Sequence, residues 1–423
     1  MRANRTKVRR LLYITQWFPP EPVAIPIWVA QALDRQGWQV EVLTGQPNYP
    51  VGKVQDGYRA GKFARDTTEG FSVTRTPLFA SHDSSAIYRM LNYLSWGFTS
   101  GLVSPWLSRG RGVSLVYSSP ATAAIPAMVA RVTVRRPFVL LVQDIWPDSV
   151  TSSGFINSGF LSKFVSVILT RFVDLSYRMA SQIIVISPGA KALLERRGVS
   201  AAKVQVVHNW ADEQVMRPIP ASGELKRSLG LTDSSFVLMY AGSMGPAQAL
   251  HHAIDAVDKT SAHIHLVLVG GGVCREALEE QASKVGGGRV HFLPSVPLSE
   301  VSKLMADADA QLISLDSDPL FEVTMPSKVQ SVLASGCVCI AAAPGDAART
   351  IAAAGGRATP PGDSTALALA IDEIAHLDPE DRIAMRTQAL RYYHQYLSED
   401  AGSEALSQIL HNVLDVDGKR SCS

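Results

Sequence analysis

Short apolar runs alternate along the chain with longer segments in which apolar residues recur every three or four positions. The longer segments have the spacing of amphipathic helices, and the short runs are rich in Val, Ile and Leu, like strands covered on both faces. Such alternation predicts an α/β fold with parallel sheets between helices. The expected strands lie in VRRLLYIT, QVEVLTG, FSVTRTP, SLVYSS, FVLLVQD, QIIVIS, VQVVHN, FVLMYAG, IHLVLVGGG, VHFLPS, AQLISL and VCIAAA.

Two domains are expected, because 423 residues exceed the size at which a single core stops growing. The boundary is predicted in HNWADEQVMRPIP, where the strand pattern ends and prolines appear. We therefore expect domains at 1–210 and 211–385, and at 386–423 a C-terminal helix that packs back on the domains, with a tail. Domains of this kind bind ligands outside the carboxyl ends of their strands.

A short helix is predicted in VTMPSKVQSVLASG, residues 323–336. Pro326 suits its first position and Gly336 its end. Lys328 then lies in the first turn, where the positive end of the helix dipole disfavours a cation by about 0.3–1 kcal/mol. An anionic ligand at this helix end would offset that cost.

Glycines follow two of the predicted strands in the second half. YAGSMG contains Gly242 and Gly245, and LVGGG places three more at 270–272. Glycine lets the backbone approach a ligand closely, and a helix N-terminus offers N–H groups to a phosphate. Together with Lys328, these loops predict a nucleotide diphosphate site. A dinucleotide site is not expected, because the first turn after a strand, FPPEPVAIP, has no glycine and the second strand ends without an acid.

Carboxylates follow strands in both halves. LLVQDIWPDS places Gln143 and Asp144 after a buried strand, where a carboxylate can orient a hydroxyl or accept its proton; a cap of the next segment is the alternative. Asp316 and Asp318 have an Asp-x-Asp spacing that binds metal in some enzymes of another fold, but Pro319 follows and favours a turn. No metal cofactor is expected.

Charge is divided unevenly along the chain. Residues 1–210 contain 24 Lys and Arg against 11 Asp and Glu, a net charge of +13, whereas residues 211–423 contain 16 against 27, a net charge of −11. The basic half favours an anionic partner such as lipid or polyphosphate; two differently solvated surfaces are the alternative. No nucleic acid is expected as a partner, because no recognised motif accompanies the charge.

The segment SSAIYRMLNYLSWGFTSGLVSPWL, residues 84–107, is apolar and aromatic, with Arg89 as its one charge. It predicts either a core helix or a face that touches lipid at the bilayer interface. No uncharged apolar run reaches the roughly 18 residues of a spanning helix. The cysteines lack the spacing of a disulfide framework or zinc site, which favours a cytoplasmic location: Cys274, Cys337, Cys339 and Cys422.

Eight segments, in the expected order, resemble the GT4 family of GT-B glycosyltransferases, and more closely the bacterial branch that builds surface polysaccharides such as O-antigen and colanic acid, related to fucosamine transferases. They are QWFPPEP, GQPNYPVGKVQDGYR, VQDIWPDS, VISPGAKALLERRGV, VQVVHNWAD, YAGSMGPAQAL, VHFLPSVP and PSKVQSVLASG. The resemblance implies two Rossmann-like domains facing across a cleft. It implies transfer of a sugar from a UDP- or GDP-sugar, with retained configuration and no metal ion. The implied acceptor is a saccharide on polyprenyl diphosphate, reached by an enzyme peripheral on the inner face of the plasma membrane.

The resemblance also implies roles for individual residues. Gln143 and Asp144 match the position where many relatives carry His-Asp facing the donor sugar and acceptor, and Lys328 is the third residue expected to act in catalysis. The diphosphate would be held by Gly242, Ser243, Gln248, Ser327 and Lys328. The nucleoside and sugar would contact Gly270, Gly271, Ser295, Val296, Glu322 and Ser331.

Relatives often carry Arg and Lys at the positions of Ser243 and Gln248, and a ribose-binding Glu at that of Ser331. Because this chain has uncharged residues there, we expect Lys328 to supply the missing positive charge and to stabilise the leaving diphosphate. Two alternatives are a sugar-nucleotide 2-epimerase on the same fold and a non-catalytic scaffold that binds lipid or a partner transferase.

Overall fold

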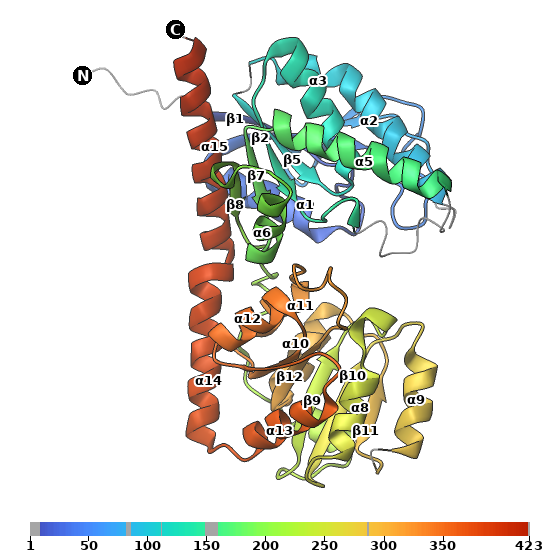
Figure 1. The fold of residues 1–423 in the computed structure, drawn as a ribbon, viewed down its shortest axis with the longest axis vertical. Coiled ribbons are helices and arrows are strands. Elements are labelled where there is room, and N and C mark those ends of the chain that lie inside the picture. Colours follow the sequence, from blue (N-terminus) through green and yellow to red (C-terminus); the bar gives the residue numbers. More distant parts are fainter. Residues whose placement is uncertain (1–8, 82–85, 111, 149–159, 286, 422–423) are drawn as a thin grey trace, which may run out of the picture. The chain divides into compact units, whose positions relative to one another are not determined.

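The computed structural model describes residues 9–81, 86–110, 112–148, 160–285 and 287–421. The chain divides into two compact units: unit 1 is Met1–Val207 with Ser403–Ser423, and unit 2 is His208–Gly402. Each unit contains a sheet with helices against its faces (Figure 1). The chain is therefore an α/β protein with two Rossmann-like sheets, as the alternating pattern predicts.

Unit 1 is built on an eight-stranded sheet in the order β3-β4-β2-β1-β5-β6-β7-β8, in which β3 alone is antiparallel to its neighbour among the described strands. Every residue of its central strands β5 and β6 is buried, which explains the continuous apolar sequence FVLLV of β6. The strands are β1 Arg9–Ile14, β2 Trp38–Gly45, β3 Ala64–Thr68, β4 Phe71–Thr76, β5 Val113–Ser118, β6 Phe138–Val142, β7 Gln182–Val185 and β8 Val204–Val206. The helices are α1 Ala24–Arg35, α2 Ala86–Ser108, α3 Ala124–Val134, α5 Phe160–Met179, α6 Pro188–Arg196 and, from Ser403 onward, α15 Glu399–Ser421.

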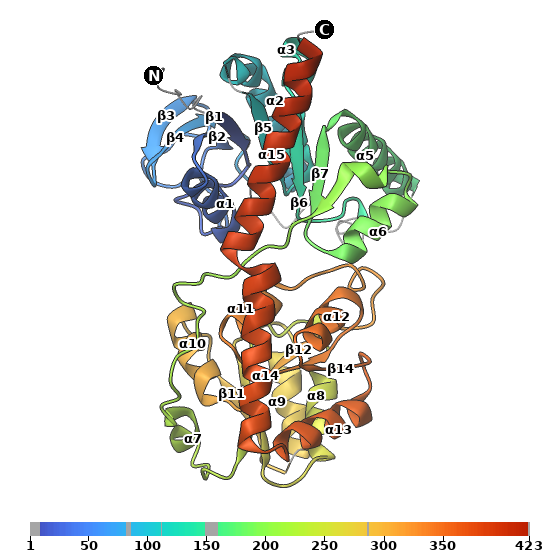
Figure 2. The same ribbon diagram turned by 90° about the vertical axis from the view of Figure 1, so that its left-hand side faces the viewer.

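The end of the chain packs on unit 1 through α15, which runs across the sheet in Figure 2. The Trp38 side chain is buried, its indole Nε1 donates to Ser407 Oγ at 3.0 Å, and its ring stacks on that of His411. Leu414 lies against Gly112, which precedes β5. Because Trp38 begins β2, these contacts place α15 at the amino ends of the strands and leave the carboxyl ends for ligands.

Unit 2 is built on a six-stranded parallel sheet in the order β11-β10-β9-β12-β13-β14. The strands are β9 Phe236–Ala241, β10 Ile264–Val269, β11 Val290–Leu293, β12 Ala310–Ser314, β13 Cys339–Ala342 and β14 Arg357–Thr359. The helices are α7 Glu224–Ser228, α8 His251–Asp258, α9 Arg275–Lys284, α10 Leu298–Asp307, α11 Ser327–Ala334, α12 Gly345–Ala353, α13 Ser364–Ala375 and α14 Pro379–Tyr392, with a π-helical turn at Tyr393–Leu397.

Two strands, β3 and β14, were not predicted. β3 has the sequence ARDTT, and none of its residues is fully buried. β14 is only three residues long and lies at an edge of its sheet. Both lack the apolar run that marks a covered strand, so the pattern could not reveal them.

Strand order determines where each sheet can hold a ligand. In unit 2 the order reverses between β9 and β12, and in unit 1 between β1 and β5. The loops that leave the two strands at such a point turn to opposite faces, and a crevice opens at their carboxyl ends.

The structure also bears on the membrane and cysteine predictions. None of the described helices has both the length and the apolar composition needed to cross a bilayer. Cys337 and Cys339 are buried and Cys274 is half-buried, all as free thiols. Cys422 lies outside the described residues.

Candidate active site

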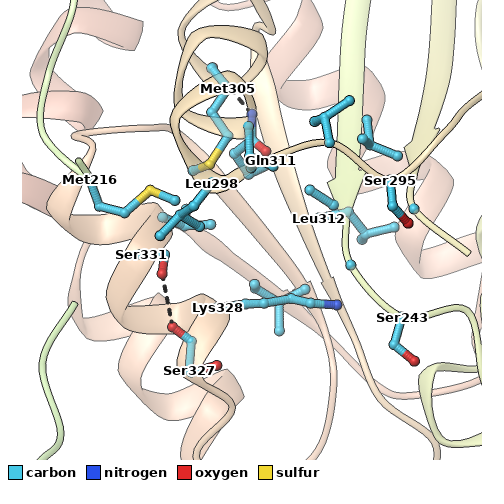
Figure 3. Close-up of a pocket in the computed structure, with 18 of the residues that line it drawn as sticks. Met216, Ser243, Ser295, Leu298, Met305, Gln311, Leu312, Ser327, Lys328 and Ser331 are labelled. Atoms are coloured by element: carbon cyan, nitrogen blue, oxygen red, sulfur yellow. Dashed lines mark hydrogen bonds between the residues drawn. The ribbon is translucent and has the colours of Figure 1, made fainter. Parts of the chain in front are cut away.

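A cavity of about 530 Å³ lies at the carboxyl ends of the strands in unit 2 (Figure 3). Its wall comes from the loops after β9, β10 and β11, from β12, and from α10 and α11. It brings together nine of the predicted site residues: Gly242, Ser243, Gly270, Gly271, Ser295, Val296, Ser327, Lys328 and Ser331. The cavity is therefore at the reversal of strand order between β9 and β12.

Glycine is required where the β9 and β10 loops meet α11. Gly242 has φ +140°, and a Cβ at this position would lie 2.5 Å from Lys328 Cε. Gly270 has φ +133°, and a Cβ there would lie 2.1 Å from the carbonyl oxygen of Gly242. The two glycines thus let the Lys328 side chain and two backbone segments approach one another without a steric clash.

Lys328 extends from the first turn of α11 across the cavity (Figure 3). Its Nζ lies 3.6 Å from the centre of the Tyr240 ring and donates to the Tyr240 hydroxyl. That hydroxyl donates in turn to the carbonyl oxygen of Ser243 at 2.6 Å. The ammonium is therefore held in place by an aromatic face and a hydroxyl, neither of which carries a negative charge.

The electrostatics of the cavity are unusual because Lys328 is the only ionisable residue in its wall, as far as the structure describes it. Burial lowers the pKa of Lys328 to about 7. Burial also raises the pKa of Tyr240 well above its usual range, so the phenol stays neutral. A negatively charged ligand in the cavity would stabilise the charged form of Lys328 and would raise its pKa toward the ordinary value.

The start of α11 differs slightly from the prediction. Pro326 has extended backbone and precedes the helix, which begins at Ser327. Gly336, with φ +61°, follows the helix end as expected. Lys328 is consequently the second helical residue. Its backbone N–H is one of the first four in the helix, which have no carbonyl partner one turn back.

Other predicted donor residues lie partly in the cavity wall. Ser331 lines it, and its hydroxyl donates to the carbonyl oxygen of Ser327 at 3.2 Å. Gln248 lies outside the wall, because its Oε1 accepts from the Gly245 N–H at 3.0 Å and closes the turn after β9. Glu322 is also outside the wall; it is exposed, and its backbone oxygen accepts from the Asp346 N–H at 3.1 Å.

The Asp-x-Asp segment forms a turn. Asp316 Oδ1 accepts from the Ser317 N–H at 2.7 Å, and Asp318 Oδ1 accepts from the Leu320 N–H at 2.7 Å. Among the residues that the structure describes, no three His, Cys, Asp or Glu side chains are grouped so that they could hold a metal ion.

Gln143 and Asp144 belong to unit 1 and follow β6. Asp144 is exposed, and its Oδ2 accepts from the Ser119 hydroxyl at 2.7 Å. Ser119 follows β5, so the two side chains meet at the carboxyl ends of adjacent strands. Gln143 is half-buried beside it. The serine hydrogen bond leaves Asp144 Oδ1 with no partner that the structure records, and so able to accept from a substrate hydroxyl.

Aromatic side chains surround this end of unit 1. Trp17 follows β1, and its ring centre lies 5.5 Å from that of Tyr49 and 6.2 Å from that of Tyr93 on α2. Tyr93 packs edge-on to Trp146, two residues beyond Asp144. Because Trp146 is buried and the other three are more open, the cluster presents aromatic faces next to the carboxylate.

Two family domains match the chain in order. A glycosyl transferase 4-like domain matches residues 28–210, and a glycosyl transferases group 1 domain matches residues 235–376, so that the matched residues make up most of the chain. The chain belongs to the group 1 (GT4) glycosyltransferases. It is thus a glycosyltransferase, and the second match contains most of the cavity residues.

Two relatives of this glycosyltransferase are similar over most of their length. One is the putative colanic acid biosynthesis glycosyl transferase WcaI of Escherichia coli K12, 25% identical over 75% of this chain and 79% of the relative. The other is the probable glycosyltransferase WbjE of Pseudomonas aeruginosa, 24% identical over 69% of this chain and 74% of the relative.

Solved structures show that the fold of this glycosyltransferase is GT-B. HepE of Anabaena, crystallised with UDP, superposes with a TM-score of 0.70 at 17% identity, covering 95% of this chain and 100% of HepE. WaaG, a glycosyltransferase involved in lipopolysaccharide biosynthesis, superposes with a TM-score of 0.60 at 16% identity, covering 95% of this chain and 99% of WaaG. At these identities the likeness concerns the fold alone.

Sequence reasoning missed Tyr240 and the apolar side of the cavity. Tyr240 lies in FVLMYAG, which looks like any buried strand. The apolar wall comes from Met216, Leu298, Val301 and Met305, in a loop and a helix far from the glycine motifs. The one available signal was the extra polar group that Tyr240 adds to an otherwise apolar strand.

Proposed function

We propose that this glycosyltransferase transfers a sugar from a UDP-sugar to a lipid-linked saccharide during synthesis of a surface polysaccharide. Lys328 carries the proposal, since it is a half-buried cation at a helix N-terminus in a cavity whose wall has no other ionisable residue, as far as the structure describes it. A diphosphate is the anion that suits such a site, because the helix N–H groups and the ammonium can share its charge. HepE, which has the same fold, was crystallised with UDP and with UDP-glucose, which favours UDP over GDP.

The proposed reaction breaks the bond between the sugar anomeric carbon and the UDP oxygen and forms a bond from that carbon to the acceptor hydroxyl oxygen. Negative charge grows on the diphosphate as its bond breaks. A fixed ammonium and helix-end N–H groups stabilise this charge more in the transition state than in the ground state, which is the requirement for catalysis. Lys328 and the N–H groups of Ser327 and Lys328 would have this role, without a metal ion.

The acceptor hydroxyl must lose a proton in the same reaction. We assign both the orientation of that hydroxyl and the acceptance of its proton to the Asp144 carboxylate, with Ser119 holding the carboxylate from one side and Gln143 beside it. The aromatic faces of Trp17, Tyr49 and Tyr93 would contact the apolar face of an acceptor sugar. A polyprenyl-diphosphate carrier is favoured by the net charge of +13 over residues 1–210 and by the surface-polysaccharide names of WcaI and WaaG. Such an acceptor would hold the enzyme at the cytoplasmic face of the membrane.

The test is nucleotide release from a panel of UDP- and GDP-sugars, with lipid-linked saccharide fractions as acceptors. We expect release from one UDP-sugar only when an acceptor is present, and loss of release with Lys328→Ala. Conversion of the donor into an epimer without acceptor would establish the epimerase alternative. Absence of any nucleotide-sugar binding, measured by thermal shift, would establish the scaffold alternative.

A further inference from the structure

The helix α2 exposes a continuous row of large apolar side chains in unit 1. The most exposed are Ile87, Phe98 and Leu102, with 71%, 66% and 64% of their surface open to solvent. The full row, here called the α2 stripe, is Ile87, Leu91, Leu94, Phe98, Leu102 and Trp106. Successive members are three or four positions apart, so all six lie on one side of the helix.

The opposite side of α2 already provides the contacts that the fold needs. Trp96 is fully buried there, and Ser100 and Ser104 are buried with their hydroxyls bonded to backbone oxygens. Gly97 lets α3 approach closely, since a Cβ at Gly97 would lie 2.6 Å from Ile125 Cδ1. Because these contacts fix the helix, the α2 stripe is surplus to the packing of unit 1. Contiguous exposed apolar surface of this kind marks an interaction site.

The charges on α2 and in the sequence that follows it are all positive. From Ala86 to Gln143 the sequence contains six arginines and no aspartate or glutamate. Arg89 lies near the start of the stripe, and Arg109, just beyond its end, is exposed. Arg65, from β3, places its guanidinium 5.0 Å from the centre of the Trp106 ring and also pairs with Glu41 at 3.2 Å. Cations therefore lie at both ends of an apolar surface.

We propose that the α2 stripe docks this glycosyltransferase on a bilayer that contains anionic lipid, with α2 lying in the plane of the interface. This inference rests on the proposed function, which places the acceptor in a membrane. A helix with an exposed face of Leu, Ile, Phe and Trp and with flanking arginines has the composition of an interfacial helix. The arginines match anionic headgroups, each contributing electrostatic attraction near the surface.

The same charges argue against a second copy of the chain as the occupant. Two α2 stripes packed face to face would bring the Arg89, Arg109 and Arg65 groups of both copies together, with no acidic residue on the helix to compensate. The extent of the stripe also suits a membrane, because the 20 residues of helix from Ile87 to Trp106 span about 28 Å along the surface.

The experiment is flotation of the full chain with vesicles of phosphatidylglycerol and phosphatidylethanolamine, compared with phosphatidylcholine vesicles. We expect binding to the anionic vesicles, and at least tenfold weaker binding for Phe98→Glu/Leu102→Glu. The matched control is Leu369→Glu, which adds the same charge at an apolar residue 68% exposed on α13 of unit 2 and should bind like wild type. An Arg89→Gln/Arg109→Gln variant should lose affinity and show a weaker salt dependence.

Other outcomes would overturn the docking surface. Equal flotation of wild type and of the double variant Phe98→Glu/Leu102→Glu, with the variant melting within a few degrees of wild type, would place the membrane contact elsewhere. A dimer in solution that the same variant dissociates would show that a second copy covers the stripe. UDP binding to unit 2 is measured separately on each variant. Loss of flotation in a variant that still binds UDP is therefore an effect of the α2 stripe alone. Absence of UDP binding in wild type would instead contradict the proposed function.

Discussion

The Nζ of Lys328 lies 3.6 Å from the centre of the Tyr240 ring and donates a hydrogen bond to its hydroxyl. A cation over an aromatic face is stabilised without being neutralised. The cavity thus holds an ammonium that is oriented but has no acidic side chain beside it in the wall, as far as the structure describes that wall, which is the arrangement needed for a group that must respond to an incoming diphosphate.

Donor affinity should therefore depend on pH. The pKa of Lys328 is lowered to about 7 by burial, so above pH 7 a growing share of the free protein has a neutral amine that cannot pair with the diphosphate. UDP-sugar affinity should fall by up to about tenfold per pH unit between roughly pH 7.5 and 9. Calorimetry on wild type and Lys328→Met would measure it, and a similar slope in both proteins would contradict the assignment.

The same lysine should lower the stability of unit 2. In an unfolded chain its pKa is about 10.4, so between about pH 7 and 10.4 the unfolded state binds more protons at this residue than the folded state. The contribution of Lys328 to stability thus becomes more favourable as pH rises through that window. Lys328→Met should raise the melting temperature most at pH 6 and least near pH 10. A pH-independent difference in melting temperature would rule out this linkage.

Gly242→Ala should impair donor binding more than folding. The new Cβ would meet Lys328 Cε at 2.5 Å, and the side chain would have to leave its place over Tyr240. We expect at least tenfold weaker UDP-sugar binding. Gly230→Ala is the control, because Gly230 also has a positive φ, +67°, but open space around it, so only backbone strain of about 1–2 kcal/mol results. Equal affinities in the two variants would show that the close approach has no role.

Asp144→Asn should lower turnover about 100-fold or more and leave donor affinity unchanged, because the amide can still bond Ser119 but cannot accept a proton. The control is Asp148→Asn in the same loop, whose carboxylate pairs with Arg197 at 2.6 Å. Initial rates at saturating donor would check both. Turnover near that of wild type in Asp144→Asn would show that the carboxylate only caps the next segment and has no role in catalysis.

Trp17→Ala should raise the KM for the acceptor about tenfold with little change in donor affinity, because its indole is the largest of the more open rings in the aromatic cluster beside Asp144. Trp17→Phe should retain most of the affinity, since it keeps an aromatic face. If donor affinity also fell about tenfold in Trp17→Ala, the substitution would have disturbed the fold of unit 1. Near-ultraviolet circular dichroism would reveal such a disturbance.

Much of the fold could be predicted because strands covered on both faces read as continuous apolar runs. All twelve expected strand segments contain strands, whereas the uncovered β3 gave no such signal. The helix around Lys328 was also predictable, from Pro326 and Gly336. The position of Tyr240 beneath Lys328 was not. It depends on β9 and β12 being neighbours in the sheet, although β10 and β11 lie between them in sequence.

The segment containing α2 shows a different limit. Both of its faces are apolar, so its periodicity could not distinguish a core helix from a lipid-facing one. The structure shows that one face is buried around Trp96 while the other, around Phe98, is open. The positions of α3, β2 and β4 decide which face is covered, and those positions follow from long-range packing.

The packing of Trp38 against α15 has a consequence for how the protein is made. Residues from Ser403 onward complete unit 1, although the rest of that unit ends at Val207. During synthesis on the ribosome, unit 1 emerges first but cannot bury Trp38 against Ser407 and His411 until all of unit 2 has also been translated. The amino ends of the strands of unit 1 therefore stay uncovered until the segment that follows unit 2 has been made.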